Sequence, residues 1–354
     1  MIFRLSIIPR ERRQVTDMTR TRTINGAIAA ALIIFPIVTA LICIGIGRYS
    51  VSVPETVRLL LGGPLPYGQQ DMAYSVIYNV RLPRIILAVI VGAGLACSGA
   101  AFQGLFTNPL ATPDTLGVAS GASFGAVLAM MFEANLIVVQ ISALIFGLAA
   151  CFITYNISRI RGQSSIVMIV LGGMVVSAMF QAFVSLAKYV ADPLDKLPSI
   201  TYWLMGSMAS STYRTLALGA PFIVAGIALI FALRWRLNIL SLNEDEVRSM
   251  GMNIKTMRFM VILGASLITS SCVSMCGQVG WVGLLVPHVA RMLMGSSNKT
   301  VVPISISLGA VFMLVMDTFA RSATAAEIPI SILTAIIGAP FFIILLRKTG
   351  GAWS

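Results

Sequence analysis

The side chains that most often carry out chemistry are few in this sequence, and they are scattered. Cys272 and Cys276 share one face of a helix, but two thiols do not complete a metal site. The single histidine, His288, follows a proline, and we expect it to fix a helix end or bond a neighbouring helix. The five cysteines are odd in number and lie in apolar stretches: Cys43, Cys97, Cys151, Cys272 and Cys276. We therefore predict no catalytic residue, no metal site and no disulfide framework, with the cysteines packing as small hydrophobic residues.

An energy source is also missing from the sequence. It contains no GxxxxGK[ST] motif, so it cannot hold a nucleotide phosphate in a P-loop, and we expect no bound cofactor. It contains neither HExxH nor a pair of intramembrane aspartates. Asp317 and Arg291 are the ionisable residues nearest to membrane depth, and both lie near the ends of apolar segments. This scarcity disfavours a proton- or sodium-coupled carrier.

The composition identifies lipid as the solvent of this chain. Of its 354 residues, 57% are hydrophobic and only 11% are charged, and the mean hydropathy is +0.91. Soluble domains are about one quarter charged, so a soluble fold of this composition would expose large apolar patches. The net charge of +12 comes with too few polar residues for a disordered or nucleic-acid-binding chain. We predict an all-α, polytopic membrane protein with no nucleic-acid partner.

A helix needs about 20 mostly apolar residues to cross the bilayer. Ten segments qualify: 24–47, 81–106, 112–132, 135–157, 164–189, 213–234, 257–278, 280–295, 301–317 and 328–347. The eighth is the weakest because it is short and contains Pro287, His288 and Arg291. We interpret 24–348 as one ten-span domain that follows a basic tail at 1–23.

The basic residues predict the orientation of these spans. With the N-terminus in the cytoplasm, 17 of the 25 Lys and Arg residues fall on the inside and eight on the outside. This is the positive-inside bias, and ten spans also return Arg347 and Lys348 to the cytoplasm. We expect both termini to be cytoplasmic.

Two connecting loops are too long to be simple turns. The outside segment 48–80 predicts a short interfacial helix around Val53 to Leu61, followed by a cluster of glycines and prolines. The inside segment 237–256 predicts a short helix with Asn243 as its N-cap, acidic residues in its first turn and Gly251 at its end. Val247 and Met250 lie three residues apart, and we expect them to face the membrane or a partner together.

Small residues predict where helices approach one another closely. Gly117, Gly121 and Gly125 recur every four residues in the third span, so one face of that span is nearly bare backbone. The second span carries a looser version at Gly92, Gly94 and Gly99. This pattern concerns packing and does not identify a substrate.

Several ordered motifs resemble those of one transport family. They are Arg81-Leu-Pro-Arg84, Asn108 to Gly117, Trp203 to Gly206, Gly280 to Arg291, Asp317 to Arg321, Glu327-Ile-Pro-Ile and Gly338 to Phe342. Over about residues 27–348 the chain resembles the permease subunits of ABC importers for ferric siderophores, haem and cobalamin. Motifs in this order are far more specific than any one of them alone.

The resemblance implies the partners that the sequence itself lacks. It implies a second permease subunit, identical or paralogous, two cytoplasmic ATPase subunits that bind ATP and Mg²⁺, and an extracytoplasmic substrate-binding protein. It also implies that the short helix in 237–256 contacts the ATPase. The residues that would carry this contact are Asn243, Glu244, Asp245, Glu246, Val247, Met250, Gly251, Met252 and Asn253.

The resemblance also implies a docking surface and a path. Arg81, Arg84 and Arg321 match external arginines that pair with acidic residues of the binding protein, where charge pairs orient docking. Anchoring of the second span at the interface is the alternative for Arg81 and Arg84. The implied path and its gates comprise Ser164, Ser165, Gly172, Gly173, Ser177 and Gln181, with Trp203 and Gly206 in a short re-entrant helix. Helix packing is the alternative for each of these.

The family leaves the cargo open, and other classes of protein remain to be weighed. A ferric siderophore is the first candidate cargo, with haem or cobalamin as alternatives in the same machinery. A secondary carrier for a metal chelate would need no ATPase and is a more remote possibility. A membrane-embedded enzyme is disfavoured because catalytic groups are missing. The expected location is the bacterial cytoplasmic (inner) membrane.

Overall fold

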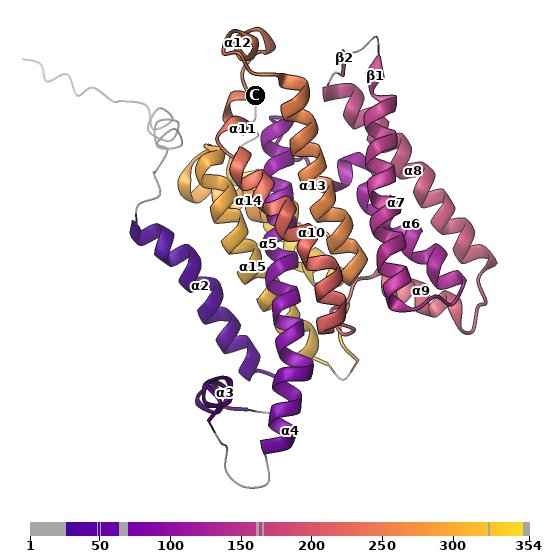
Figure 1. Cartoon of the computed structure of the whole chain (residues 1–354), viewed down its shortest axis with the longest axis vertical. Helices are drawn as coiled ribbons and strands as arrows, with labels where there is room; N and C mark the ends of the chain where they lie inside the picture. Colours follow the sequence, from indigo (N-terminus) through magenta and orange to yellow (C-terminus); the bar gives the residue numbers. More distant parts are fainter. Residues whose placement is uncertain are drawn as a thin grey trace, which may run out of the picture.

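The computed structural model describes residues 26–349 except 48, 50, 64–69, 161–162, 165 and 325, so the predicted tail at 1–23 lies outside the described residues. Each of the ten predicted apolar segments coincides with a helix (Figure 1). These helices are α2 (Gly26–Gly45), α5 (Leu82–Leu105), α6 (Val118–Met131), α7 (Leu136–Ile157), α8 (Ile166–Val190), α10 (Tyr213–Leu233), α13 (Ile254–Cys276), α14 (Val282–Met294), α15 (Asn298–Ser322) and α16 (Ile330–Thr349). The all-helical architecture of the prediction is confirmed.

Shorter elements connect the long helices. They are α3 (Val53–Leu60), α4 (Gln70–Ser75), a π-helix (Val76–Arg81), a 3₁₀ turn (Pro113–Leu116), the hairpin strands β1 (Arg159–Ile160) and β2 (Gln163–Ser164), α9 (Lys196–Leu204), α11 (Arg236–Ile239) and α12 (Glu244–Ser249). The predicted interfacial helix is α3, which Ser52 and Glu55 close with a capping box. In Figure 1, α12 and the β-hairpin lie at the upper end of the molecule and α3 and α4 at the lower end. The cytoplasmic assignment of the upper end stays a prediction.

Seven helices of the described chain are long and apolar enough to cross a membrane. The other three predicted spans correspond to shorter apolar helices, Val118–Met131, Val282–Met294 and Ile330–Ile344. At 1.5 Å per residue, the 14 residues of α6 cover about 21 Å, less than the hydrocarbon thickness of about 30 Å. The span is shortened because Gly117, with φ of 74°, separates α6 from the 3₁₀ turn. The count of ten full spans is therefore not established.

Three helices form the centre of the protein. Most residues of the apolar windows in α5, α13 and α15 are buried, whereas only 11% of the window in α2 is. Figure 1 shows α2 at one side of the molecule and α6, α7 and α8 grouped at the other. Helices that are exposed and apolar in the single chain are suited to contact lipid or another subunit.

Glycines allow the central helices to touch through their backbones. A Cβ atom at Gly99 of α5 would lie 1.9 Å from the carbonyl oxygen of Gly283 in α14. On α6, Cβ atoms at Gly121 and Gly125 would approach the backbone oxygens of Phe146 and Ser142 in α7 to 2.6 and 2.4 Å. The predicted packing face of the third span is thereby confirmed at these two positions.

Buried hydroxyl groups join α13 to the helices around it. Ser98 of α5 donates to the carbonyl of Ala265 at 3.1 Å. Ser270 donates to Leu144 of α7 at 3.1 Å, and Ser271 donates to Gly219 of α10 at 2.8 Å. These bonds satisfy hydroxyl groups that cannot reach water, and they fix α13 as the hub of the bundle.

Candidate functional site

The segment that is predicted to contact an ATPase forms a short helix, α12, at one end of the bundle. Asn243 occupies the N-cap position of α12, but its side chain makes no capping hydrogen bond there. Gly251 has φ of 74°, and its N–H donates to the carbonyl of Arg248 at 2.9 Å, so it ends the helix as predicted. Asn253 then caps α13 by accepting a hydrogen bond from the N–H of Thr256 at 3.1 Å. The loop is a structured element between two helices.

Val247 and Met250 of this loop do not share one exposed face. Val247 is 1% exposed and packs into the main hydrophobic core, whereas Met250 is 61% exposed. The prediction that both would face outward fails for Val247, because its side chain packs into the core and only Met250 stays exposed. Val247 anchors the loop, and Met250 belongs to the surface that it presents.

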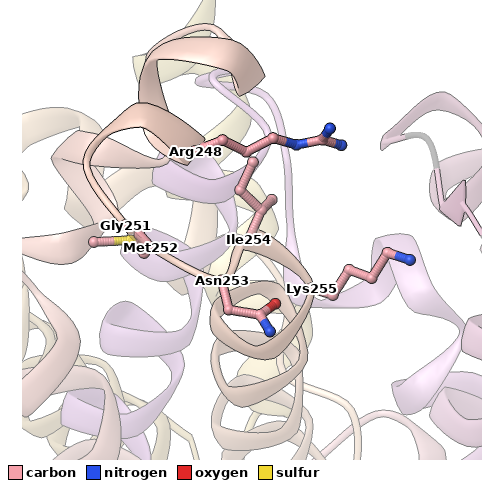
Figure 2. Close-up of a pocket in the computed structure, with 6 residues that line it drawn as sticks. All are labelled: Arg248, Gly251, Met252, Asn253, Ile254 and Lys255. Carbon is pink, nitrogen blue, oxygen red and sulfur yellow. The ribbon is translucent and has the colours of Figure 1, made fainter.

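A hollow of about 530 Å³ lies where the loop enters α13. Its lining residues are Arg248, Gly251, Met252, Asn253, Ile254 and Lys255. Figure 2 shows the side chains of Arg248 and Lys255 extending to the same side of the loop. The arrangement combines a cationic side with the apolar side chains of Met252 and Ile254, which suits contact with an acidic and partly apolar protein surface.

The three arginines predicted for docking are buried in the single chain. Arg84 is 5% exposed and donates from Nε to Asp317 at 2.9 Å and from Nη1 to Glu327 at 2.9 Å. Arg321 is 8% exposed and lies on the other side of Asp317, with Nε and Oδ2 3.8 Å apart. These residues join α5, α15 and the segment before α16 in one charged cluster.

The same cluster holds the end of α2. Arg81 donates to the carbonyl oxygens of Ile44 at 2.8 Å and Tyr49, and Arg321 donates to the carbonyl of Cys43. Cations suit the C-terminal end of a helix, where backbone carbonyls have no intrahelical partner. Docking by Arg81, Arg84 and Arg321 stays a prediction, and it would require them to exchange these internal partners. Arg58 and Arg214, by contrast, are exposed.

The predicted path residues of α8 divide into packing and polar groups. Gly172 and Gly173 are buried, and a Cβ at Gly173 would lie 1.9 Å from the carbonyl oxygen of Thr115. This contact is helix packing, the alternative weighed above. Ser177 and Gln181 instead form a polar group with Ser120 of α6: the two serine hydroxyls lie 2.8 Å apart, and Gln181 lies within 3.4 Å of both.

Trp203 and Gly206 mark the end of the short helix α9. Gly206 has φ of 75°, and a Cβ there would lie 2.4 Å from the carbonyl oxygen of Gln278, after α13. Trp203 is half-buried and packs against a hydrophobic cluster formed by residues of α6 and α7 with Val273 of α13. The structure thus joins the α9–α10 turn to the α13–α14 turn.

Sequence reasoning missed Ser120, Ser123 and Gln278 as parts of this polar region. Gln278 donates from Nε2 to the hydroxyl of Ser123 at 2.8 Å. A signal was available, because Gln278 is an amide at the end of the apolar segment 257–278 and both serines lie in the glycine-rich third span. Ser165 lies outside the described residues, and Ser164 is described only as part of β2, so their predicted gate role stays a prediction.

No group of three or more His, Cys, Asp and Glu residues placed to hold a metal ion occurs in the described ranges. His288 is buried, and its ring lies 6.5 Å from that of Phe342. All five cysteines are free and buried. Within the described ranges, amide and hydroxyl groups lie inside the bundle together with charged side chains such as Arg291, which donates to Gln103, and a larger charged cluster joins α5, α15 and the segment before α16.

Comparison with known proteins identifies the family. The model of the FecCD transport family matches residues 33–348. The molybdate import system permease protein MolB of Haemophilus influenzae is 42% identical over 313 residues, covering 88% of this chain and 93% of the relative. An iron chelatin transport system permease protein of Helicobacter pylori is 36% identical over 277 residues, covering 78% and 83%. Other relatives are named as cobalamin, haem and ferric citrate permeases.

A solved structure shows the same architecture. It is an inward-facing conformation of a metal-chelate type ABC transporter, 40% identical in sequence, with a TM-score of 0.83 over 92% of this chain and all of that chain. The relatives are transport subunits, so the prediction of a non-enzymatic permease agrees with them at that level. This chain is a multi-pass membrane permease that belongs to the FecCD transport family.

Proposed function

We propose that the chain is the permease subunit of an ABC importer in a bacterial cytoplasmic membrane. It pairs with a second permease subunit, receives cargo from an extracytoplasmic binding protein and is driven by two ATPase subunits that bind ATP and Mg²⁺. The observation that carries this proposal is the arrangement of the α12 loop. Its Met250 side chain is exposed, and the hollow beside it is lined on one side by Arg248 and Lys255. Val247 packs in the core and anchors the loop. A loop anchored in this way can pass a displacement of the ATPase to α13, the hub of the bundle.

The cargo of this proposal is a ferric siderophore. The relative named for iron chelatin transport supports it, as does the likeness to a metal-chelate type transporter. The polar group at Ser120, Ser177 and Gln181 is neutral, which suits a path that must release a bulky chelate rather than hold it.

Molybdate is a second candidate, because the relative with 42% identity is named for molybdate import. Molybdate is a compact oxyanion and a ferric siderophore is a large organic complex, so the two need different amounts of space but both present oxygen atoms. Transport measurements can separate them directly.

The test is uptake into proteoliposomes that contain the permease, its ATPase and its binding protein. We expect ATP-dependent accumulation of a ⁵⁵Fe-siderophore and none without the ATPase. Accumulation of molybdate in its place would replace the first cargo by the second. Uptake driven by a proton gradient in the absence of ATP would contradict the importer proposal and favour a secondary carrier.

A further inference from the structure

Two turns and the first residues of α16 meet between the spans, near the end of α9. The N–H of Ser207 donates to the carbonyl of Cys276 at 2.9 Å, and the N–H of Ile330 donates to the carbonyl of Gly206 at 3.0 Å. The hydroxyl of Ser331 donates to the carbonyl of Gln278. The α9–α10 turn, the α13–α14 turn and the start of α16 are thereby tied into one unit, which we call the junction.

The junction lies at membrane depth. Its residue Gln278 bonds to Ser123, which stands eight residues before the last residue of α6 at Met131. Eight residues correspond to about 12 Å along a helix axis. The α14 helix that follows the junction has only 13 residues, about 20 Å, so it is too short to cross the apolar layer of about 30 Å. Non-helical backbone at this depth is tolerated only where protein covers it or where it lines a water-filled space.

Gln278 is not completely covered by this chain. Its residue is half-buried, as are Val279, Gly280 and Trp281 after it. Trp281 has φ of 69°, a left-handed conformation that is rare outside glycine, and strained residues of this kind cluster at functional sites. Exposure of the Gln278 amide to hydrocarbon would be costly, so a polar space or a further protein surface beside this partly uncovered residue is favoured over lipid.

The surroundings hold Gln278 in one position. Ser123 accepts its amide N–H at 2.8 Å, and Ser331 binds its backbone carbonyl. Gly277 before it has φ of 73°, and a Cβ there would lie 2.3 Å from the carbonyl oxygen of Trp203. The backbone of residue 278 is fixed by Ser331 and its side-chain amide by Ser123, so the amide is preorganised to contact a passing molecule.

A second side-chain amide, that of Gln181, also bonds to a serine of α6. Gln181 is exposed on the apolar helix α8 and bonds to Ser120, which is three residues before Ser123 on α6. Residues three apart lie on neighbouring positions of a helix surface, so α6 positions both amides. The hydrogen-bond partners recorded for both amide groups are neutral serine hydroxyls.

We propose that Gln278, positioned by Ser123, contacts the cargo in the outer part of the path and helps to select it. This inference rests on the proposed transport function and names a specificity residue within it. The amide would donate to, or accept from, a cargo rich in oxygen atoms, whether a ferric chelate or an oxyanion. A neutral contact of this kind guides a cargo without retaining it.

The first test compares transport with ATP hydrolysis in the complete reconstituted importer. With the ⁵⁵Fe-siderophore or molybdate as cargo, we expect Gln278→Ala to lower the uptake rate roughly fivefold, the effect of one neutral hydrogen bond. ATP hydrolysis stimulated by the binding protein should stay within about twofold, because α12 is untouched. Gln278→Glu should lower uptake of an anionic cargo further than Gln278→Ala does.

The control variant is Gln140→Ala. It removes a side-chain amide that is 2% exposed and bonded to Thr215, and it should not alter the preference between cargoes.

The second test does not depend on transport. A Gln278→Cys thiol should react with a water-soluble methanethiosulfonate reagent, whereas Ser274→Cys, at a residue 3% exposed, should not. The five native thiols are buried and give a low background. An unreactive thiol at 278, or equal losses of uptake and ATP hydrolysis in Gln278→Ala, would overturn the inference. Absence of ATP-dependent uptake in the unmodified importer would instead overturn the proposed function, and the thiol result would still stand by itself.

Discussion

Arg84 of α5 and Asp317 of α15 form a buried ion pair across 233 positions of sequence, with Nε and Oδ1 2.9 Å apart. The aspartate side chain is 2% exposed and the arginine side chain 7% exposed. Asp317 also faces Arg321, and Arg84 also binds Glu327, so the pair is the centre of a larger cluster. This cluster closes one end of the protein at the place where the sequence resemblance implies docking.

The first prediction concerns removal of one member of this pair. Asp317→Ala should destabilise the protein by about 3–5 kcal/mol, because it leaves buried arginines without their counter-charge. Replacing both partners, as Arg84→Met with Asp317→Leu, should restore much of that loss. Thermal unfolding of the purified permease in detergent measures both, with the exposed Arg58→Ala as control. Equal stability of the single and double variants would show that the pair is not coupled.

The second prediction concerns the end of α2. Arg81→Ala removes donors to the carbonyls of Ile44 and Tyr49, so hydrogen exchange of backbone amides near the end of α2 should become faster. Arg81→Lys keeps the charge but not the planar fork, and it should give an intermediate rate. Exchange in α13 serves as the internal reference. If exchange near Cys43 and Ile44 does not change in Arg81→Ala, the guanidinium does not hold this helix end.

Much of the fold could be predicted from hydropathy alone, because lipid imposes a simple rule on every spanning segment. The helices α2, α7 and α8 begin and end within a few residues of the predicted segments. The shortness of α14 was predicted, but the shortening of α6 was not, because the segment is apolar and the break at Gly117 comes from left-handed backbone. Hydropathy reports how apolar a segment is, and not whether its backbone stays helical.

The candidate site was predicted less completely, because contacts between distant segments decide it. The sequence predicted a short helix within 237–256, and α12 lies there, but the burial of Val247 depends on tertiary packing that the sequence pattern does not show. Arg84 carries the motif expected of an external cation, yet Asp317 and Glu327 bind it internally. Gln278 gave only a weak signal, since its meaning depends on Ser123 lying beside it.

The third prediction concerns the backbone contact between α5 and α14. Gly99→Ala places a methyl group 1.9 Å from the carbonyl oxygen of Gly283, so the helices must separate. We expect a loss of about 1–3 kcal/mol, typical of overpacking in a close-packed interior. Gly172→Ala is the matched control, because its Cβ would meet its nearest neighbour at an ordinary 3.5 Å. Unfolding temperatures should separate the two variants, and similar values would contradict this account of the contact.

The last prediction separates the two roles in the α12 loop. Met250 is 61% exposed, so Met250→Glu should leave the stability of the isolated permease nearly unchanged. In the proposed importer it should weaken association with the ATPase, because it places a new charge in a contact surface. Val247 is 1% exposed, so Val247→Ala should instead lower stability by about 1–3 kcal/mol and loosen the loop. Co-purification with the ATPase and thermal unfolding measure the two effects independently. Full ATPase binding and normal coupled hydrolysis in Met250→Glu would place the contact elsewhere on the permease, while a stability loss in that variant would mean that Met250 supports the fold.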